Sequence, residues 1–188
     1  DLANVLGNLV SRTVAMITKY FGGSVAKSLP QNEQGVDGEF KALATETVKK
    51  VIQKADALKI ADAISEIFTL LRRANKYIDE TMPWALAKEE EKLPRLETVL
   101  YNLIEGISIG ASLLESFMPS TAKRIAEQIN GSLRSLEECK TFGLYPSGNK
   151  VTDKPEILFA RLDIKEVLEK VEALKAASGK SLPKYEGV

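Results

Sequence analysis

The sequence predicts an all-α protein, a bundle of about five helices with an extended C-terminal arm and a terminal helix. Apolar residues recur at steps of three and four along most of the chain, which is the period of an amphipathic helix. Apolar and polar residues nowhere alternate as they do along a half-buried strand. The chain has 188 residues, 44% of them hydrophobic, which is enough for one core and leaves little room for a second.

Helical periodicity marks six stretches, which span residues 2–21, 40–58, 62–80, 93–117, 122–130 and 164–176. The first stretch ends at Gly22 and Gly23, because glycine commonly closes a helix C-terminus. The second follows a Pro, Asn, Gln and Gly segment at 28–38, which predicts a loop. The third stops before Met82 and Pro83, because the residue that precedes proline disfavours helical geometry.

The second half of the chain contains the longest predicted helix and the arm. Pro119 closes the fourth stretch, and Gly131 ends the fifth. Turn-forming residues interrupt the periodicity between 132 and 163, and the terminal helix follows. We therefore expect one helical domain at 1–176, with its core at 1–137 and an arm at 138–176, and a flexible tail or linker at 177–188.

The composition removes most of the usual tools of catalysis. The chain has no His and a single Cys139, which excludes a disulfide within the chain and any multi-cysteine zinc site. Basic and acidic residues balance at 26 each, so no overall positive field attracts nucleic acid regardless of its sequence. No apolar stretch is long enough to span a membrane, and a single thiol fits a reducing compartment, so we expect a soluble, cytoplasmic protein. The first residue is Asp1 and no apolar leader follows it, so we expect an excised piece of a larger protein.

A polar strip runs along the first predicted helix. Asn4, Asn8 and Arg12 are spaced four residues apart, and this spacing keeps them on one face. Asparagine is a poor residue for a helix interior, since its amide competes for backbone partners, so two in register suggest a binding role. The alternative is that the polar strip is only the solvated face of an amphipathic helix.

The only tryptophan, Trp84, follows Pro83 just after the third predicted helix. A ring at a helix junction, close to Asn and Arg donors, could stack on an unpaired RNA base while the donors hydrogen-bond its edge. A lone tryptophan is also a common core anchor, and the sequence leaves both interpretations open.

Three stretches together resemble the methionyl-tRNA synthetase family. They are LANVLGNLVSR at 2–12, ANKYIDETMPW at 74–84 and LFARLD at 158–163. Their order and separation also fit, so the resemblance covers nearly the whole chain. The first stretch alone is not specific, because related class I synthetases share an Asn-rich first helix. The second stretch, which ends in Pro83 and Trp84, makes the resemblance specific to this family.

The resemblance implies that the chain is the helical anticodon-binding domain of such an enzyme and reads the anticodon CAU. The residue that matches Trp84 stacks on the first anticodon base in the family. The residues that match Asn8 and Arg12 hydrogen-bond the same base. These roles come from the resemblance and not from the spacing.

Four further positions belong to the implied site. Asn4 and Pro83 match residues that line it, and Asn75 and Asp79 match residues that support it. One departure lies in the third stretch, where the family usually has proline and this chain has Ala160. The arm packs toward the catalytic domain in the family, so we expect this change to loosen a turn and to spare anticodon reading.

The resemblance also implies a parent enzyme, an ATP-dependent ligase that joins methionine to its tRNA. The chain has neither of the family's two ATP-binding signatures nor its zinc-binding insertion, so we expect no catalytic residue, cofactor or metal here. ATP, and zinc in members that have the zinc-binding insertion, would belong to the catalytic domain. The implied partners are a CAU tRNA and that catalytic domain, without DNA or membrane, and we expect the isolated chain to be monomeric.

Two alternatives remain open. The chain could be the anticodon domain of another class I synthetase, such as the cysteinyl, leucyl or isoleucyl enzyme. It could also be a helical-bundle scaffold for protein interactions, whose polar strip is surface only.

Overall fold

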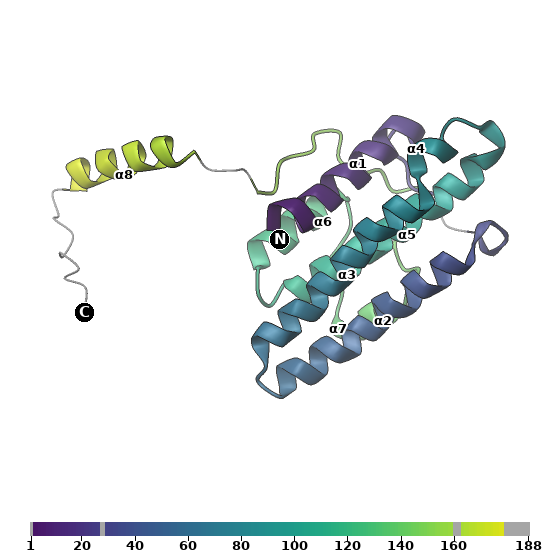
Figure 1. Cartoon of the computed structure of the whole chain (residues 1–188), viewed down its shortest axis with the longest axis horizontal. Coiled ribbons are helices and arrows are strands. Elements are labelled where there is room, and N and C mark those ends of the chain that lie inside the picture. Colours follow the sequence, from purple (N-terminus) through teal and green to yellow (C-terminus); the bar gives the residue numbers. More distant parts are fainter. Residues whose placement is uncertain (1, 27–28, 160–162, 179–188) are drawn as a thin grey trace.

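The bundle is built around one helix, α5 (Leu93–Leu114), in the computed structural model, which describes residues 2–26, 29–159 and 163–178. From Leu96 onward nearly every residue of α5 is buried, because apolar and small side chains occupy all sides of this helix. It packs against α1 (Asn8–Phe21), α2 (Gly35–Asp56), α3 (Ile60–Thr81) and α6 (Pro119–Gln128). Figure 1 shows α2 and α3 as a long hairpin beside α5, with α1 along another side.

The remaining elements are short or lie outside the bundle. They are a π-helical opening turn at Leu2–Gly7, 3-10 turns at Pro30–Asn32 and Glu90–Lys92, and helices α4 (Pro83–Leu86), α7 (Leu136–Cys139) and α8 (Ile164–Ser178). Within the described ranges the only β pairing is an isolated bridge between Ser24 and Lys150. The all-α bundle expected from the sequence is thus confirmed.

The helix boundaries differ from the predicted ones where side chains cap an end. Helix α2 starts at Gly35, five residues before the predicted start at 40, because the Asp37 carboxylate accepts a hydrogen bond from the Gln34 backbone at 2.7 Å and closes the first turn. Helix α7 was not predicted, and its Ser135 cap accepts from the Glu138 backbone. Helix α8 runs two residues beyond the predicted 176.

Two buried carboxylates join the helices internally. Asp37 of α2 accepts from Arg95 of α5 at 2.6 and 2.9 Å and from the Tyr77 hydroxyl of α3. Glu105 of α5 accepts from Arg134 at 2.9 and 3.1 Å. Both carboxylates are fully buried, and burial of an unpaired charge would destabilise the fold. The hydrogen bonds from these partners offset that cost.

The arm lies against the bundle over much of its length. Cys139, Tyr145, Val151 and Leu158 are buried in the same hydrophobic cluster as the helices. Arg124 of α6 holds the next part of the arm, donating to Glu156 at 2.6 Å and to the carbonyls of residues 157 and 158 at 3.2 Å. Ala160 and the tail from 179 onward lie outside the described residues, so the expected effects of both stay predictions.

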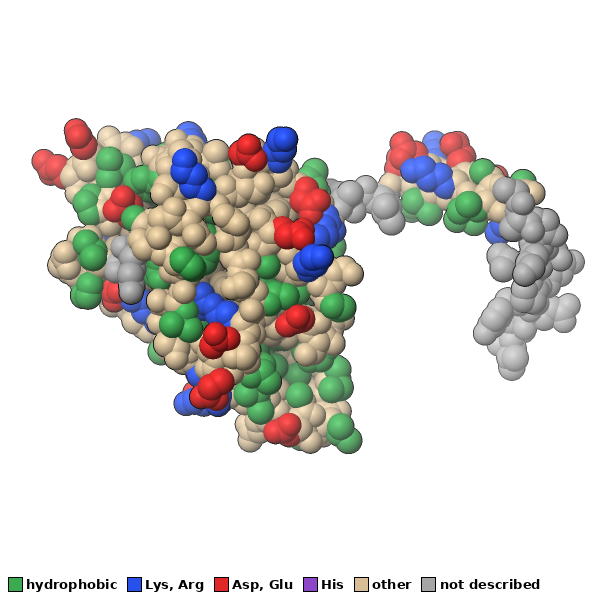
Figure 2. All heavy atoms as spheres, turned by 180° about the vertical axis from the view of Figure 1, so that it is seen from behind, with side chains coloured by type: hydrophobic (Ala, Val, Ile, Leu, Met, Phe, Trp, Pro, Cys, Tyr) green, Lys and Arg blue, Asp and Glu red, His purple; other side chains and the backbone are tan. Residues whose placement is uncertain are grey.

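The described surface carries both signs of charge. Figure 2 shows basic and acidic side chains next to one another on one face of the bundle, in agreement with the balanced composition.

Helix α8 lies apart from the bundle and exposes Ile164, Leu168 and Leu174. None of the described helices is both long and apolar enough to cross a membrane.

Candidate nucleic-acid interface

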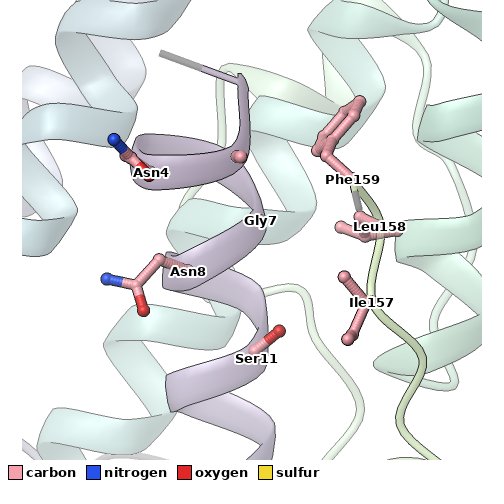
Figure 3. A pocket seen from close by; sticks show the side chains of 8 residues that line it. Asn4, Gly7, Asn8, Ser11, Ile157, Leu158 and Phe159 are labelled. Carbon is pink, nitrogen blue, oxygen red and sulfur yellow. The ribbon is translucent and has the colours of Figure 1, made fainter. Parts of the chain in front are cut away.

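The polar strip lies on an accessible side of the opening helical segment. Asn4 and Asn8 are exposed and Arg12 is half-buried, while Leu6, Leu9 and Val10 between them are buried. Figure 3 shows the Asn4 and Asn8 side chains on the same side of the helix. Two amides that can both donate and accept are therefore presented together to solvent.

Helix α3 contacts the opening segment at two points. The Asn75 side-chain nitrogen donates to the Val5 carbonyl at 3.1 Å and to the Leu71 carbonyl of its own helix at 3.0 Å. One turn further along α3, Asp79 Oδ1 lies 3.6 Å from Arg12 Nη2. Because Asp79 is 68% exposed, this ion pair orients the guanidinium more than it stabilises the fold.

Trp84 is placed by a sharp turn at the end of α3. Met82 has a left-handed backbone, with φ of 44°, and its amide closes α3 by donating to the Ile78 carbonyl at 3.0 Å. Pro83 is buried at the first position of α4, where its missing N–H costs nothing. The Trp84 side chain remains 43% exposed. The ring thus lies at the helix junction that the sequence predicted, and its exposure argues against the core-anchor interpretation that the sequence left open.

The structure brings together some of the predicted site residues. Asn75 contacts the opening turn, and Asp79 contacts Arg12. Trp84 lies five residues after Asp79 in the sequence. Among the described residues no hydrogen bond or ring contact joins Trp84 to the polar strip. The Trp84 ring, Asn4 and Asn8 are exposed to solvent, whereas Arg12 is paired with Asp79.

Two basic side chains that flank Asn75 on α3 are paired within the protein. Arg73 Nη1 lies 2.9 Å from Glu80 Oε2, and Lys76 Nζ lies 3.5 Å from Glu80 Oε1. Contacts to base edges and faces should consequently matter more here than a general attraction to phosphate. In the part of the chain that the structure describes, no group of three or more His, Cys, Asp or Glu side chains could hold a metal ion.

A cavity of about 460 Å³ lies on the other flank of the opening segment. Its lining consists of Ala3, Asn4, Gly7, Asn8, Ser11, Ile157, Leu158 and Phe159. Figure 3 shows that the Asn4 and Asn8 side chains point away from the arm residues that form its second wall. The cavity thus adjoins the polar strip at Asn4 and Asn8, whose amide groups are directed away from its arm wall.

Sequence reasoning missed the π form of the opening turn and the arm residue Phe159 beside it. Neither has a local sequence signal. The turn accepts a hydrogen bond from residue 75, and the cavity is completed by an arm about 150 residues away in sequence.

The comparison with known families decides the identity of the fold. Residues 30–177 match the family model described as the anticodon binding domain of methionyl tRNA ligase. The chain belongs to this family. The match includes Asn75, Asp79, Pro83 and Trp84 and begins after the polar strip.

Curated methionine–tRNA ligases extend the likeness to the opening helix. The enzyme of Clostridium perfringens is 47% identical over 177 residues, which is 94% of this chain and 27% of that protein. The enzyme of Clostridium acetobutylicum is 43% identical over 186 residues, or 99% of this chain and 28% of that protein, so the alignment includes the polar strip. The chain thus spans little more than a quarter of these methionine–tRNA ligases.

Solved structures agree with the fold. Apo Mycobacterium tuberculosis methionyl-tRNA synthetase superposes with a TM-score of 0.79 at 29% identity, covering 87% of this chain and 33% of that one. The same enzyme in complex with methionyl-adenylate gives 0.78 at 30% identity, covering 86% and 31%. The helical bundle of this anticodon-binding domain therefore has close counterparts in methionyl-tRNA synthetases.

Proposed function

We propose that this anticodon-binding domain reads the CAU anticodon of a methionine tRNA for a methionine–tRNA ligase. The observation that carries the proposal is the half-exposed Trp84 ring on α4, five residues after the carboxylate that orients Arg12 of the polar strip. An aromatic face and a guanidinium next to exposed amides suit an unstacked base, which needs a stacking partner and edge donors.

The chemistry favours cytosine as the first base. Its Watson–Crick edge has two acceptors, N3 and O2, and the Arg12 guanidinium and the Asn8 amide both donate. Asn4 and Pro83 line the same site, and Asn75 and Asp79 support it. Stacking of the base on Trp84 contributes about 1–3 kcal/mol.

The wider functional assignment belongs to the same proposal. The parent enzyme is a cytoplasmic ATP-dependent ligase, with ATP, and zinc where it is present, bound by a catalytic domain that is the second partner of this chain. The anticodon-binding domain itself binds tRNA and not DNA, catalyses nothing alone, and is monomeric.

The test is the affinity of the 188-residue chain for a CAU stem-loop RNA and for a stem-loop whose first anticodon base is replaced by G. Trp84→Ala should weaken CAU binding about 5- to 150-fold and remove the preference for C. Leu136→Ala is the matched control, because this side chain is 51% exposed on α7, at another part of the bundle. It should leave both affinities unchanged.

Three results would contradict the proposal. A preference for a different anticodon would indicate another class I synthetase. Absence of any RNA binding at millimolar concentration would favour a protein-interaction scaffold. Equal losses in Trp84→Ala and Leu136→Ala would indicate general destabilisation and not a base-stacking role.

A further inference from the structure

The opening turn, Leu2–Gly7, is a π-helix, whereas the segment continues as an ordinary α-helix from Asn8. A π turn closes its backbone hydrogen bonds over five residues and not four, and such turns are rare and frequent at functional sites. Here the π turn contains Asn4, while Asn8 and Arg12 lie in the α-helical part. The polar strip therefore crosses the point where the helix changes its winding.

The change of winding sets the direction of Asn4. Residues four apart in an α-helix differ by about 40° around the axis. In a wider turn each residue advances by a smaller angle, so Asn4 takes another position relative to Asn8 than an unbroken α-helix would give it. Figure 3 shows the two amides on the same side.

Among the described residues, one side-chain hydrogen bond from another helix reaches the backbone of this turn. Asn75 of α3 donates to the Val5 carbonyl in the middle of the π turn at 3.1 Å. The same nitrogen donates to the Leu71 carbonyl at 3.0 Å, so the amide is anchored in α3 and cannot follow a displaced turn. Asn75 is half-buried, which shields the bond to Val5 from competition by water.

We propose that Asn75 is a positioning residue that holds the opening turn in its π form, and that this hold directs Asn4 toward the same base-binding surface as Asn8. The inference rests on the proposed function and adds a cause for the presentation of Asn4. Asn75 itself need not touch RNA. Its contribution to binding should pass entirely through Asn4.

A double-mutant cycle in the 188-residue chain tests this route, with affinity for the CAU stem-loop as the measurement. Asn75→Ala should weaken binding about 3- to 10-fold, the value of one hydrogen bond, when Asn4 is present. In the Asn4→Ala background the same change should have no further effect. Side-chain amide NMR shifts of Asn4 should move in Asn75→Ala, while those of Asn149 should not.

The matched control is Thr69→Ala, which also removes a side-chain hydrogen bond to the preceding turn of α3, at 3.0 Å to Ser65, without contacting the opening turn. It should leave RNA affinity unchanged in both backgrounds. Equal effects of Asn75→Ala with and without Asn4 would overturn the inference. So would an Asn4→Ala variant that binds as the original chain does. The proposed function fails separately, if the original chain shows no preference for CAU.

Discussion

Asp37 shows how one residue can join three helices. Its carboxylate accepts from Arg95 at 2.6 and 2.9 Å, from the Tyr77 hydroxyl, and from the Gln34 backbone at 2.7 Å. Burial alone would raise the pKa of Asp37, but the hydrogen bonds from Arg95, Tyr77 and Gln34 outweigh it and lower this pKa below its ordinary value. Since Tyr77 lies two residues before Asp79, the network also fixes the part of α3 that faces the polar strip.

The lowered pKa of Asp37 predicts an acid-sensitive fold. A carboxylate with a lower pKa in the folded state stabilises the protein above its unfolded pKa, about 3.9, and loses this contribution as the pH falls toward the folded pKa. Urea unfolding between pH 7 and pH 3 should therefore show a decrease in unfolding free energy below about pH 4. Asp37→Asn should be less stable at pH 7 by about 3–5 kcal/mol, because it leaves Arg95 buried without its counterion.

The pH dependence separates this contribution from that of other acids. Asp37→Asn should lose less stability between pH 5 and pH 3 than the original chain does. Glu46→Gln serves as the control, since this side chain is half-exposed and its ion pair with Lys49, at 3.4 Å, lies on the surface. Parallel pH profiles for the original chain and Asp37→Asn would show that Asp37 is not the group responsible.

Individual site residues could be predicted from sequence to different degrees. Pro83 and Trp84 carry a local signal, because proline ends α3 and places the following ring at a junction. The four-residue spacing of Asn4 and Asn8 predicts their shared, exposed side. The bond from Asn75 to Val5 could not be predicted, because it joins residues 70 positions apart and depends on how α3 packs against the opening turn.

At the scale of helices, close approach depends on small residues in α5. A Cβ atom built on Gly106 would lie 2.5 Å from Phe40 Cζ, and one on Gly110 would lie 3.0 Å from Leu71 Cδ2. The Phe40 ring in turn stacks on Tyr77, with centroids 4.8 Å apart. Gly106 therefore lets α2 and α5 approach around a ring that has little room to move.

Gly106→Ala should destabilise the bundle by about 1–3 kcal/mol, because the added methyl group must displace the Phe40 ring. The matched control is Gly38→Ala in α2, where a Cβ would meet nothing within 4 Å. Since Ala favours a helix interior over Gly, this variant should be more stable by about 0.5–1 kcal/mol. Thermal or urea unfolding should therefore show a lower free energy of unfolding for Gly106→Ala and a higher one for Gly38→Ala. A neutral Gly106→Ala would mean that Phe40 has another rotamer available.

The elements found from sequence are those whose stability comes from an apolar stripe. Helices α1, α3 and α5 follow that rule, and the predicted ranges of α3 and α5 agree with the observed ones to within three residues. The predicted range 2–21 covers both α1 and the π turn that precedes it. Helix α2 begins earlier than predicted because the Asp37 cap outweighs the loop tendency of Gly35 and Gly38. Helix α7 is only four residues long and is held by its Ser135 cap, so it has no periodicity to detect.

At the scale of the whole molecule, the arm is part of what makes the bundle stable. Tyr145 of the arm donates its backbone N–H to the buried Glu105, and its hydroxyl donates to the Ile129 carbonyl. The Val25 backbone N–H donates to the Asn149 carbonyl at 2.9 Å, which ties the segment after α1 to the same arm. We therefore expect the arm up to residue 159 to fold with the bundle as one unit, although the sequence suggested a core at 1–137 and an arm that starts at 138.

Truncation after residue 137 should test this expectation. The truncated chain loses Tyr145, Val151 and Leu158 from the hydrophobic cluster and one hydrogen-bond donor to Glu105. Each large apolar side chain contributes about 1.5–3 kcal/mol when it is fully buried, so the sum approaches the 5–15 kcal/mol that stabilise a typical domain. The 1–137 chain should accordingly show a much lower midpoint in thermal unfolding, or no cooperative transition. A chain that ends after residue 159 is the control, because it keeps these contacts and, of the described elements, loses only α8, whose apolar residues are exposed. It should unfold close to the original midpoint, and a 1–137 chain as stable as this control would mean that the core does not need the arm.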